Sequence, residues 1–393
     1  MRKPTLPRFL PFIFLIAAAA LLWSAPPDDA VARGRFYDRP SLILDNGKIE
    51  LTVLPLGGSL ASIVLKDDAE KMNPLWDAIR SDQESGRPTR KDSGLGHFVC
   101  VDGFGPTSAE ERAAGFEGHG EAHRLPWALE SAVKTGKVTT LSQRAHLPIN
   151  HEVLRRTIRV ADGENVVYVN ATLESQLSFD RPACWAEHAT IGSPFLEPGV
   201  TVVDISKGRS MTRPWENRGT SNHRLASGKE FEWPVAPTVD GGTVDLRAAP
   251  NPPNSGDHTG TLLDPNSEFA WVTALHPGKR LLLGYVFRRE EYPWIQTWES
   301  YPPKGMLARG LEFGSQAFDL PRRTVVTENS LFGQLLYRWL PAQSKITGSY
   351  LMFWTRAPEG MQGVSDVEYK GGKIMVRDSR SGKSLTLNAA EKW

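Results

Sequence analysis

The chain has 393 residues, of which 46 are Lys or Arg and 45 are Asp or Glu, so its formal net charge is +1. This balance excludes the basic surface on which binding to duplex nucleic acid depends, and we predict no nucleic-acid partner. With 40% hydrophobic and 23% charged residues, the composition is typical of a globular protein and excludes a mainly disordered chain.

The first 32 residues predict a secretory signal peptide. Arg2, Lys3 and Arg8 form a positive segment, an apolar run follows over residues 9–23, and Ala-Val-Ala at 30–32 matches a small-residue cleavage pattern. The apolar run is too short for a comfortable membrane span. We therefore expect export to the periplasm or the extracellular space, with no stable membrane span after cleavage. The alternative is an uncleaved N-terminal membrane anchor.

Short runs of alternating apolar and polar residues predict strands along most of the chain. The first two, residues 41–44 and 49–54, flank Asn46-Gly47, which is a strong hairpin signal. The other runs are residues 60–65, 157–160, 166–173, 200–205, 270–275, 281–287, 324–327 and 349–354. Helical patterns are confined to residues 73–80 and 329–340. The fold class that follows is all-β, a large antiparallel β-sandwich with few short helices.

We expect this sandwich to be one domain over residues 35–360. Residues 361–393 predict a C-terminal β-hairpin extension that turns at Gly371-Gly372 and at Ser381-Gly382. The extension either completes a sheet edge or is loosely attached. Cys100 and Cys184 both lie in apolar stretches, so a single bridge and two buried free thiols are equally compatible with the sequence.

The chain lacks the motifs of several enzyme classes. It contains no G-x-S-x-G elbow, Walker A motif, H-E-x-x-H sequence or dinucleotide fingerprint. His119 and His123 have the spacing of a helical metal pair, but Gly118 and Gly120 argue against a helix at that place. We therefore predict neither a metal nor a cofactor.

Three clusters place polar residues among glycines and apolar residues. Residues 115–127 contain His119 and His123, residues 184–195 place His188 in an apolar strand, and Glu312 lies between Leu311 and Phe313. A carboxyl group in such surroundings has a raised pKa unless it is paired. Each cluster also has a purely structural interpretation, such as a turn histidine or a solvent-facing strand glutamate. Together they predict a general acid/base set.

Tryptophans accompany these clusters. Trp127, Trp185, Trp294 and Trp298 lie in or close to them, and flat aromatic rings commonly cover the faces of sugars. The competing interpretation is that most of these rings belong to the core.

At these residues the sequence resembles the galactose mutarotase-like superfamily, the aldose 1-epimerases and their relatives. The opening strands over residues 42–65 look like the first strands of the family, and residues 119–127 are similar to its H-G-F-A-R-x-x-P-W segment. Glu187-His188 and Leu311-Glu312 occupy the places of its second histidine and its catalytic glutamate. The resemblance covers most of residues 40–320.

This resemblance implies a supersandwich fold and an enzyme that interconverts sugar anomers by ring opening. Glu312 would be the base that removes the proton of the anomeric hydroxyl, and His188 would be the acid that protonates the ring oxygen from the opposite side of the ring. His119 would bind the substrate near the ring oxygen. The partner would be a monosaccharide or oligosaccharide, and no metal or cofactor would be required.

The sequence also departs from the family pattern. His123 stands in place of the arginine that reads phosphate, with Arg124 one place later and Trp127 after it. The substrate-binding aspartate of the family has no clear match. Asp240, Asp257 and His258 are the candidates, and we favour the last two. Further candidates for substrate contact are Asp102, Trp298 and Arg309, and Arg309 could instead pair with Glu312.

Two other functions remain open from the sequence. One is a non-catalytic carbohydrate-binding protein on the same scaffold, since a fold does not fix a function. The other is a polysaccharide lyase or hydrolase that recruits Arg309, Tyr292 and Tyr301. The epimerase is favoured over the carbohydrate-binding protein if His188 and Glu312 face one another across a cleft one sugar ring wide.

Overall fold

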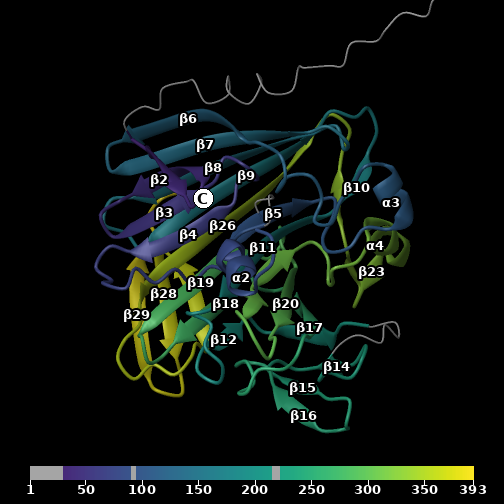
Figure 1. The fold of residues 1–393 in the computed structure, drawn as a ribbon. Coiled ribbons are helices and arrows are strands. Elements are labelled where there is room, and N and C mark those ends of the chain that lie inside the picture. The colour runs from purple at the N-terminus through teal and green to yellow at the C-terminus, as the bar shows by residue number, and fades with distance from the viewer. Residues whose placement is uncertain (1–29, 90–93, 215–221) are drawn as a thin grey trace, which may run out of the picture.

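Two large antiparallel sheets dominate the computed structural model, which describes residues 30–89, 94–214 and 222–393 (Figure 1). The all-β prediction is confirmed. The larger sheet has 12 strands in the order β1-β2-β3-β4-β5-β11-β21-β20-β17-β13-β14, and β22 pairs with both β11 and β20. Its strands are β1 (Ala32–Phe36), β2 (Arg39–Asp45), β3 (Ile49–Val53), β4 (Leu60–Leu65), β5 (His97–Val101), β11 (Trp185–Gly192), β13 (Gly208–Thr212), β14 (Glu230–Phe231), β17 (His258–Leu263), β20 (Trp294–Ser300), β21 (Ala308–Gly310) and β22 (Glu312–Gly314).

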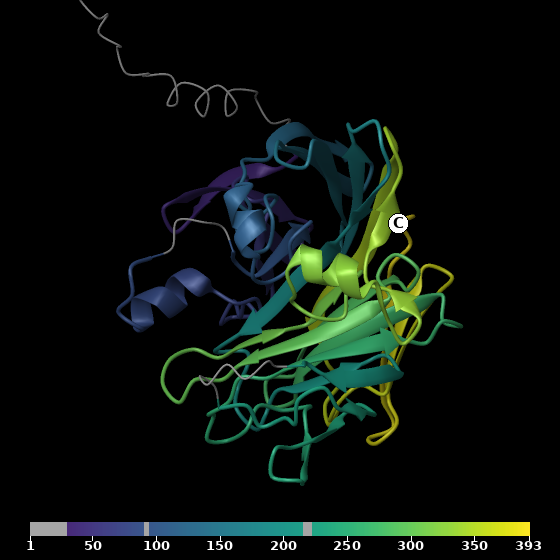
Figure 2. The same ribbon diagram turned by 90° about the vertical axis from the view of Figure 1, so that its right-hand side faces the viewer.

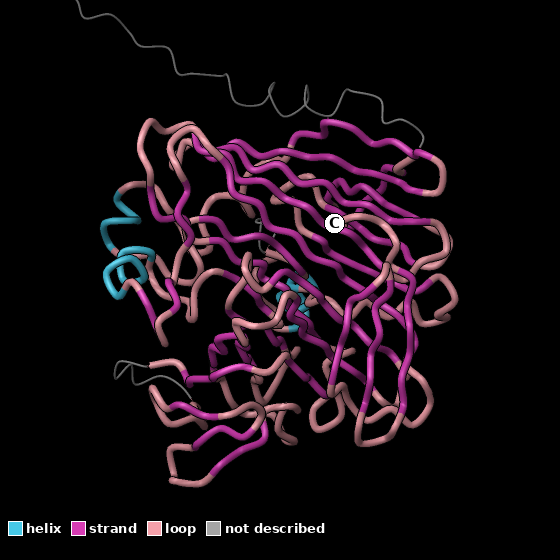
Figure 3. Tube along the Cα trace, turned by 180° about the vertical axis from the view of Figure 1, so that it is seen from behind, coloured by secondary structure: helices cyan, strands magenta, loops and turns pink. Residues whose placement is uncertain are grey.

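The second sheet has eight strands in the order β12-β18-β19-β26-β9-β8-β7-β6, and its long strands run side by side in the view from behind (Figure 3). Its strands are β6 (Ala128–Thr135), β7 (Val138–Leu147), β8 (Glu152–Ala161), β9 (Val166–Ser175), β12 (Val202–Ile205), β18 (Phe269–His276), β19 (Leu281–Arg288) and β26 (Lys345–Arg356).

In the described part of the chain, small ribbons and three short helices occupy the connections. The ribbons pair β10 (Arg181–Ala183) with β25 (Arg338–Leu340), β15 (Val235–Pro237) with β16 (Thr243–Asp245), and β23 (Ser330–Leu331) with β24 (Gln334–Leu335). The helices are α2 (Ala78–Glu84), α3 (Ala109–Ala113) and α4 (Arg322–Glu328).

The helix expected over residues 329–340 is wrong. The chain leaves α4 at Asn329, which has a φ of 64°, and Gly333 has a φ of 81°, so two left-handed residues interrupt any helix there. The segment forms β23, β24 and β25 instead. In the other segment, residues 73–80, the helix α2 begins only at Ala78.

The main core lies between the two large sheets, because the side chains of each strand alternate between its faces. In β11, Trp185, Ala189 and Ile191 belong to this core. The alternate residues of β11 therefore point to the other face of the 12-stranded sheet, and His188 is one of them. The predicted hairpin at Asn46-Gly47 joins β2 to β3, with Asp45 opposite Glu50.

The chain ends in a third layer. A three-stranded sheet of β27 (Asp366–Lys370), β28 (Lys373–Asp378) and β29 (Lys383–Asn388) packs on the outer face of the eight-stranded sheet. Ile374 and Val376 of this layer form a second core with Leu351 and Phe353 of β26. Figure 2 shows these yellow strands on the side of the molecule away from the purple N-terminal strands.

The predicted signal peptide, residues 1–32, lies outside the described residues except for its last three. Val31 is buried in the main core and Ala32 opens β1, so the predicted boundary falls at the edge of a strand. No helix in the described part of the chain is long and apolar enough to cross a membrane.

Cys100 and Cys184 are both buried and unbridged, which decides between the two open alternatives in favour of free thiols. Burial raises the pKa of Cys184 to about 12, so neither reactivity nor metal binding is expected of its thiol.

Candidate active site

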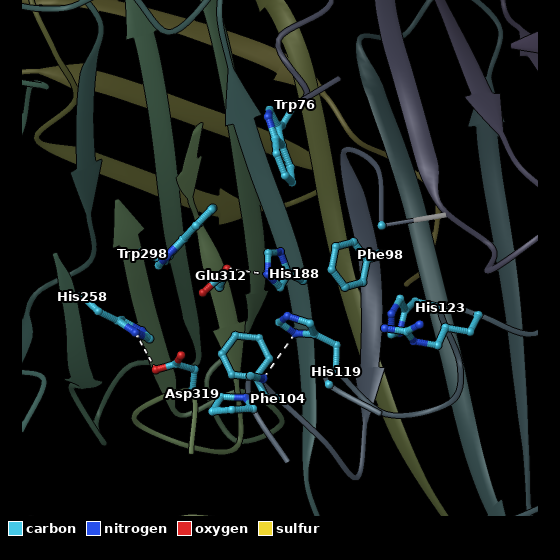
Figure 4. Close-up of a pocket in the computed structure, with 15 residues that line it drawn as sticks. Trp76, Phe98, Phe104, His119, His123, His188, His258, Trp298, Glu312 and Asp319 are labelled. Carbon is cyan, nitrogen blue, oxygen red and sulfur yellow. Dashed lines mark hydrogen bonds and ion pairs between the residues drawn. The ribbon is translucent and has the colours of Figure 1, made fainter. Parts of the chain in front are cut away.

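A cavity of about 490 Å³ opens on the face of the 12-stranded sheet that points away from the main core (Figure 4). The strands β5, β11, β17, β20 and β22 and the connections β4–β5, β5–β6 and β22–α4 supply its wall. The residues that line it are Trp76, Gly94, Phe98, Phe104, Gly105, Pro106, Gly118, His119, His123, Arg124, His188, His258, Trp298, Glu312 and Asp319.

His188 and Glu312 meet at the centre of this cavity. Nε2 of His188 lies 3.2 Å from Oε1 of Glu312, and both side chains are almost completely buried. Neither carboxyl oxygen of Glu312 has a hydrogen-bond partner in the described part of the chain. A buried oxygen left without a partner costs free energy, so this carboxyl group is arranged for a ligand rather than for the stability of the fold.

The structure corrects one expectation about this pair. His188 and Glu312 were expected on opposite sides of a sugar ring, but they are in direct contact. The reason is the sheet register: β22 pairs with β11 at Ala186–Gly314 and at Glu187–Phe313, which brings the next residues of the two strands together.

The electrostatics of the pair follow from burial. Desolvation lowers the pKa of His188 well below its usual value, and the neighbouring His119 acts in the same direction. Desolvation raises the pKa of Glu312 well above its usual value, and the charge of Asp319 adds to this. The raised pKa agrees with the prediction from the apolar neighbours of Glu312. Both shifts favour the neutral forms, a protonated Glu312 beside an unprotonated His188.

Neighbouring groups orient the imidazole of His188. Its Nδ1 lies 2.9 Å from Oγ1 of Thr190, on the same face of β11, and the ring of Phe98 stacks on it with centroids 4.3 Å apart. Phe98 lies directly opposite His188 in the register of β5 and β11. Nε2 is thereby directed at Glu312 and the cavity.

His119 and His123 reach the cavity from a turn rather than from a strand. His119 has a φ of 68°, and its Nδ1 accepts a hydrogen bond from the backbone N–H of Gly105 at 3.3 Å. Nδ1 is therefore unprotonated, and the proton of a neutral ring sits on Nε2. Burial lowers the pKa of His123 to about 3, which makes it a neutral group at physiological pH.

A second polar pair lies on the other side of Glu312 (Figure 4). Nδ1 of His258 lies 2.9 Å from Oδ1 of Asp319. Nε of Arg213 donates a hydrogen bond to the same oxygen at 2.5 Å. Burial opposes the ionisation of Asp319, but the His258 and Arg213 cations outweigh it and hold its pKa below the usual range.

Aromatic rings form the remaining walls. Trp76 and Trp298 are half-buried, with ring centroids 6.3 Å apart, and Phe98 and Phe104 line the cavity beside the histidines. Such a mixture of flat apolar faces and polar groups suits a ligand that has both, as a sugar ring does.

The structure brings together seven of the residues predicted from the sequence. These are His119, His123, Arg124, His188, His258, Trp298 and Glu312. The other four predicted residues, Asp102, Trp127, Asp257 and Arg309, do not line the cavity. Each of them makes its contacts with other parts of the fold.

Asp102 forms an ion pair with Arg181 and accepts from the N–H of Cys184 at 3.0 Å. Trp127 lies in the main core, where its indole N–H donates to the carbonyl of Ala122. Both side chains bind neighbouring segments of the chain and do not reach the cavity.

Asp257 is buried and accepts from Nε of Arg224 at 2.9 Å. Arg309 is completely buried, donates to the carbonyl of Leu246 at 2.6 Å and lies 3.6 Å from Glu299, so it does not pair with Glu312.

The residues proposed for a lyase are likewise absent from the cavity wall. Tyr292 and Tyr301 are buried in the core, with 0% and 1% of their surfaces exposed, and Arg309 is buried with them. Trp185 and Trp294 are also core residues, as the structural interpretation of the tryptophans predicted.

Sequence reasoning missed Asp319 and Trp76; it proposed residues 96–106 as part of the cleft wall but did not single out Phe98 and Phe104, which line the cavity. Asp319 lies seven positions after Glu312, and an acidic residue so soon after the third cluster was a usable signal. The aromatic residues gave none, because nothing in the sequence separates them from core residues. No group of three or more His, Cys, Asp or Glu side chains in the described residues could hold a metal ion.

Solved structures resemble this architecture over most of the chain. A galactose mutarotase-like protein from Lactobacillus casei has a TM-score of 0.53 at 14% identity, over 80% of this chain and 100% of that one. A candidate aldose 1-epimerase from Klebsiella pneumoniae has a TM-score of 0.55 at 12% identity, over 81% of this chain and 80% of that one. This is the galactose mutarotase-like fold.

A galactose mutarotase related enzyme from Lactobacillus acidophilus shares the mutarotase-like fold as well, with a TM-score of 0.52 at 10% identity over 81% of this chain and 99% of that one. No protein-family model matches the chain, and no curated protein matches its sequence. At such identities the likeness defines the mutarotase-like scaffold, and the chemistry has to be argued from the cavity.

Proposed function

We propose that the protein is an aldose 1-epimerase-like enzyme that interconverts the anomers of a sugar by opening and closing its ring. The observation that carries this proposal is the buried Glu312 carboxyl, without a hydrogen-bond partner among the described residues and 3.2 Å from Nε2 of His188 in an aromatic cavity. The mutarotase-like fold supports it.

Ring opening requires one proton to leave the anomeric oxygen and one to reach the ring oxygen, while the bond between C1 and the ring oxygen breaks. Both oxygens are bonded to C1, so an acid and a base in contact with one another can serve both from one side of the ring. The direct contact of His188 and Glu312 is thus compatible with this chemistry, although it differs from the arrangement that was expected.

The pair supplies the proton count that this reaction needs. It holds one proton, either as a neutral carboxylic acid beside a neutral imidazole or, after transfer across 3.2 Å, as a carboxylate beside an imidazolium. The first form lets Glu312 protonate the ring oxygen and His188 accept the anomeric proton. The second form gives the roles that the family resemblance implies. Closure on the other face of the carbonyl exchanges the roles and yields the other anomer.

Substitution of Glu312 tests the proposal. Freshly dissolved α-glucose and α-galactose are followed by NMR with the wild type, with Glu312→Gln and with Glu328→Gln. Glu328 is an exposed residue outside the cavity and serves as the matched control. We expect Glu312→Gln to lose at least about 100-fold in rate, because it can neither donate nor accept the proton, and the control to stay active. A folded Glu312→Gln protein with full activity would refute the assignment.

A carbohydrate-binding protein without turnover is the second candidate, and the contact between His188 and Glu312 favours it, since no gap of one ring width separates them. It predicts saturable sugar binding by calorimetry together with no acceleration of anomer exchange by the wild type. Equal sugar binding by the wild type and Glu312→Gln would strengthen this candidate.

We also propose that the protein is exported, on the strength of the positive and apolar segments within residues 1–32. Mass spectrometry of the chain recovered from the periplasm or the medium tests this, and an intact N-terminus in the cytoplasm would contradict it.

A further inference from the structure

The register of the 12-stranded sheet places Thr190 and Gly310 opposite one another, next to the acid/base pair. β11 pairs with β21 at Thr190–Gly310, and the same register continued into β22 puts His188 opposite Glu312. Because side chains alternate along a strand, all four residues belong to the cavity side of the sheet. Three of them carry polar side chains, and Gly310 carries none.

The carboxyl group of Glu312 lies directly over Gly310. A Cβ added to Gly310 would be 2.7 Å from the carboxyl carbon of Glu312, 2.7 Å from its Oε1 and 3.1 Å from its Cγ. Oε1 is also the oxygen that lies 3.2 Å from Nε2 of His188. Non-bonded carbon atoms stay about 3.5–4.0 Å apart. The carboxyl group therefore occupies the space that a side chain at position 310 would fill.

The backbone does not require glycine at this position. Gly310 is a buried residue of β21, and its φ lies outside the left-handed region. The three atoms nearest to an added Cβ all belong to the Glu312 side chain, whereas at Gly208 the nearest atom is the backbone carbonyl oxygen of Leu262, at 2.2 Å. Glycine at position 310 thus makes room for one flexible side chain and not for a neighbouring strand.

The imidazole of His188 is held in place independently of Glu312. Its Nδ1 lies 2.9 Å from Oγ1 of Thr190. The backbone of Thr190 is fixed in turn, because its N–H donates to the carbonyl of Gly96 and its carbonyl accepts from the N–H of Trp76. A displaced Glu312 carboxyl would therefore lose its contact with Nε2, since the ring would not follow it.

We propose that Gly310 is a positioning residue of the acid/base pair, and that the missing side chain at this position admits the Glu312 carboxyl to its contact with His188. This role rests on the proposed function, because the contact matters for catalysis only if the pair moves the protons of a sugar. Proton transfer between two groups depends steeply on their placement. Alanine, with one added carbon, is enough to separate them.

A double-mutant cycle in stability tests the contact without any sugar. Denaturant midpoints are measured for the wild type, Gly310→Ala, Glu312→Ala and the double variant. We expect Gly310→Ala to lower the midpoint more in the wild type than in Glu312→Ala, because only the wild type has a carboxyl group that must leave its preferred place. Equal shifts in both backgrounds would overturn the proposal. If Gly310→Ala alone does not fold, the double variant should fold, and its failure would also overturn the proposal.

Anomer exchange measures the role of Gly310 in catalysis. Gly310→Ala should lower kcat by about 10- to 100-fold and change KM by less than about threefold, because the walls that bind the sugar remain. Gly256→Ala is the matched control, since a Cβ there lies 3.6 Å from the nearest atom, and it should keep the wild-type kcat. An unchanged kcat in Gly310→Ala would overturn the positioning role.

The outcomes separate this role from the proposed function. A wild type that interconverts no sugar refutes the proposed function, while the cycle in stability still reports whether Glu312 occupies the space over Gly310. An active wild type whose kcat is unaffected by Gly310→Ala refutes only the positioning role.

Discussion

At the scale of single residues, burial decides the chemistry of the cavity. His188 and Glu312 are both surrounded by protein, and desolvation moves their pKa values in opposite directions, each toward the neutral form. The unpaired oxygens of Glu312 show that the fold tolerates a costly group at this place. The same cost gives the site a thermodynamic signature.

The stability of the wild type should fall as the pH rises above the pKa of an unfolded glutamate, about 4.3. In that range the folded protein keeps the proton of Glu312 while the unfolded chain releases it, so each pH unit removes up to about 1.4 kcal/mol until the raised folded pKa is passed. Glu312→Gln lacks this loss, because an amide does not titrate.

Denaturant unfolding of the two proteins between about pH 4 and about pH 8 measures this effect. We expect Glu312→Gln to become progressively more stable than the wild type with rising pH. A stability difference that does not change with pH would contradict a raised pKa at Glu312.

At the scale of elements, the turn that carries His119 depends on a close approach of two backbones. Gly120 has a φ of +74°, and a Cβ at this position would lie 2.1 Å from the carbonyl oxygen of Val101 in β5. The turn can therefore deliver His119 to the cavity only with glycine beside it.

Gly120→Ala should destabilise the protein by more than Gly136→Ala. Gly136 has a φ of +59° in the connection between β6 and β7, but a Cβ there meets nothing within 4 Å. The control therefore costs only the left-handed conformation, about 1–2 kcal/mol, whereas Gly120→Ala adds a backbone clash and should cost at least about 3 kcal/mol. Equal losses in denaturant unfolding would mean that the turn yields without strain.

At the scale of the whole molecule, the eight-stranded sheet is covered on both faces. One face meets the 12-stranded sheet and the other meets β27, β28 and β29, so the C-terminal extension is a third layer with a core of its own. This layering explains why β18, β19 and β26 are apolar on both faces instead of alternating.

Ile374→Ala should therefore lower the stability of the entire protein. Ile374 is completely buried between β28 and the eight-stranded sheet, and its truncation should cost about 2–5 kcal/mol. Leu385→Ala, at the partly exposed rim of the same layer, should cost less. Unfolding is followed by tryptophan fluorescence and circular dichroism. An unchanged main transition with Ile374→Ala would mean that the extension unfolds independently.

The sequence by itself determined most of the predicted strands, the hairpin at Asn46-Gly47 and the three clusters around His119, His188 and Glu312, but the strand predicted over residues 324–327 is wrong, because that segment lies in the helix α4. These features depend on neighbours in the chain, through side-chain alternation and turn residues. Only the tertiary structure decided that His188 and Glu312 touch, that Arg309 and Asp257 are internal, and that Asp319 and Trp76 reach the cavity. The physical reason is that the pairing of β5, β11, β20 and β22 selects which side chains share a face, and that pairing joins segments far apart in the sequence.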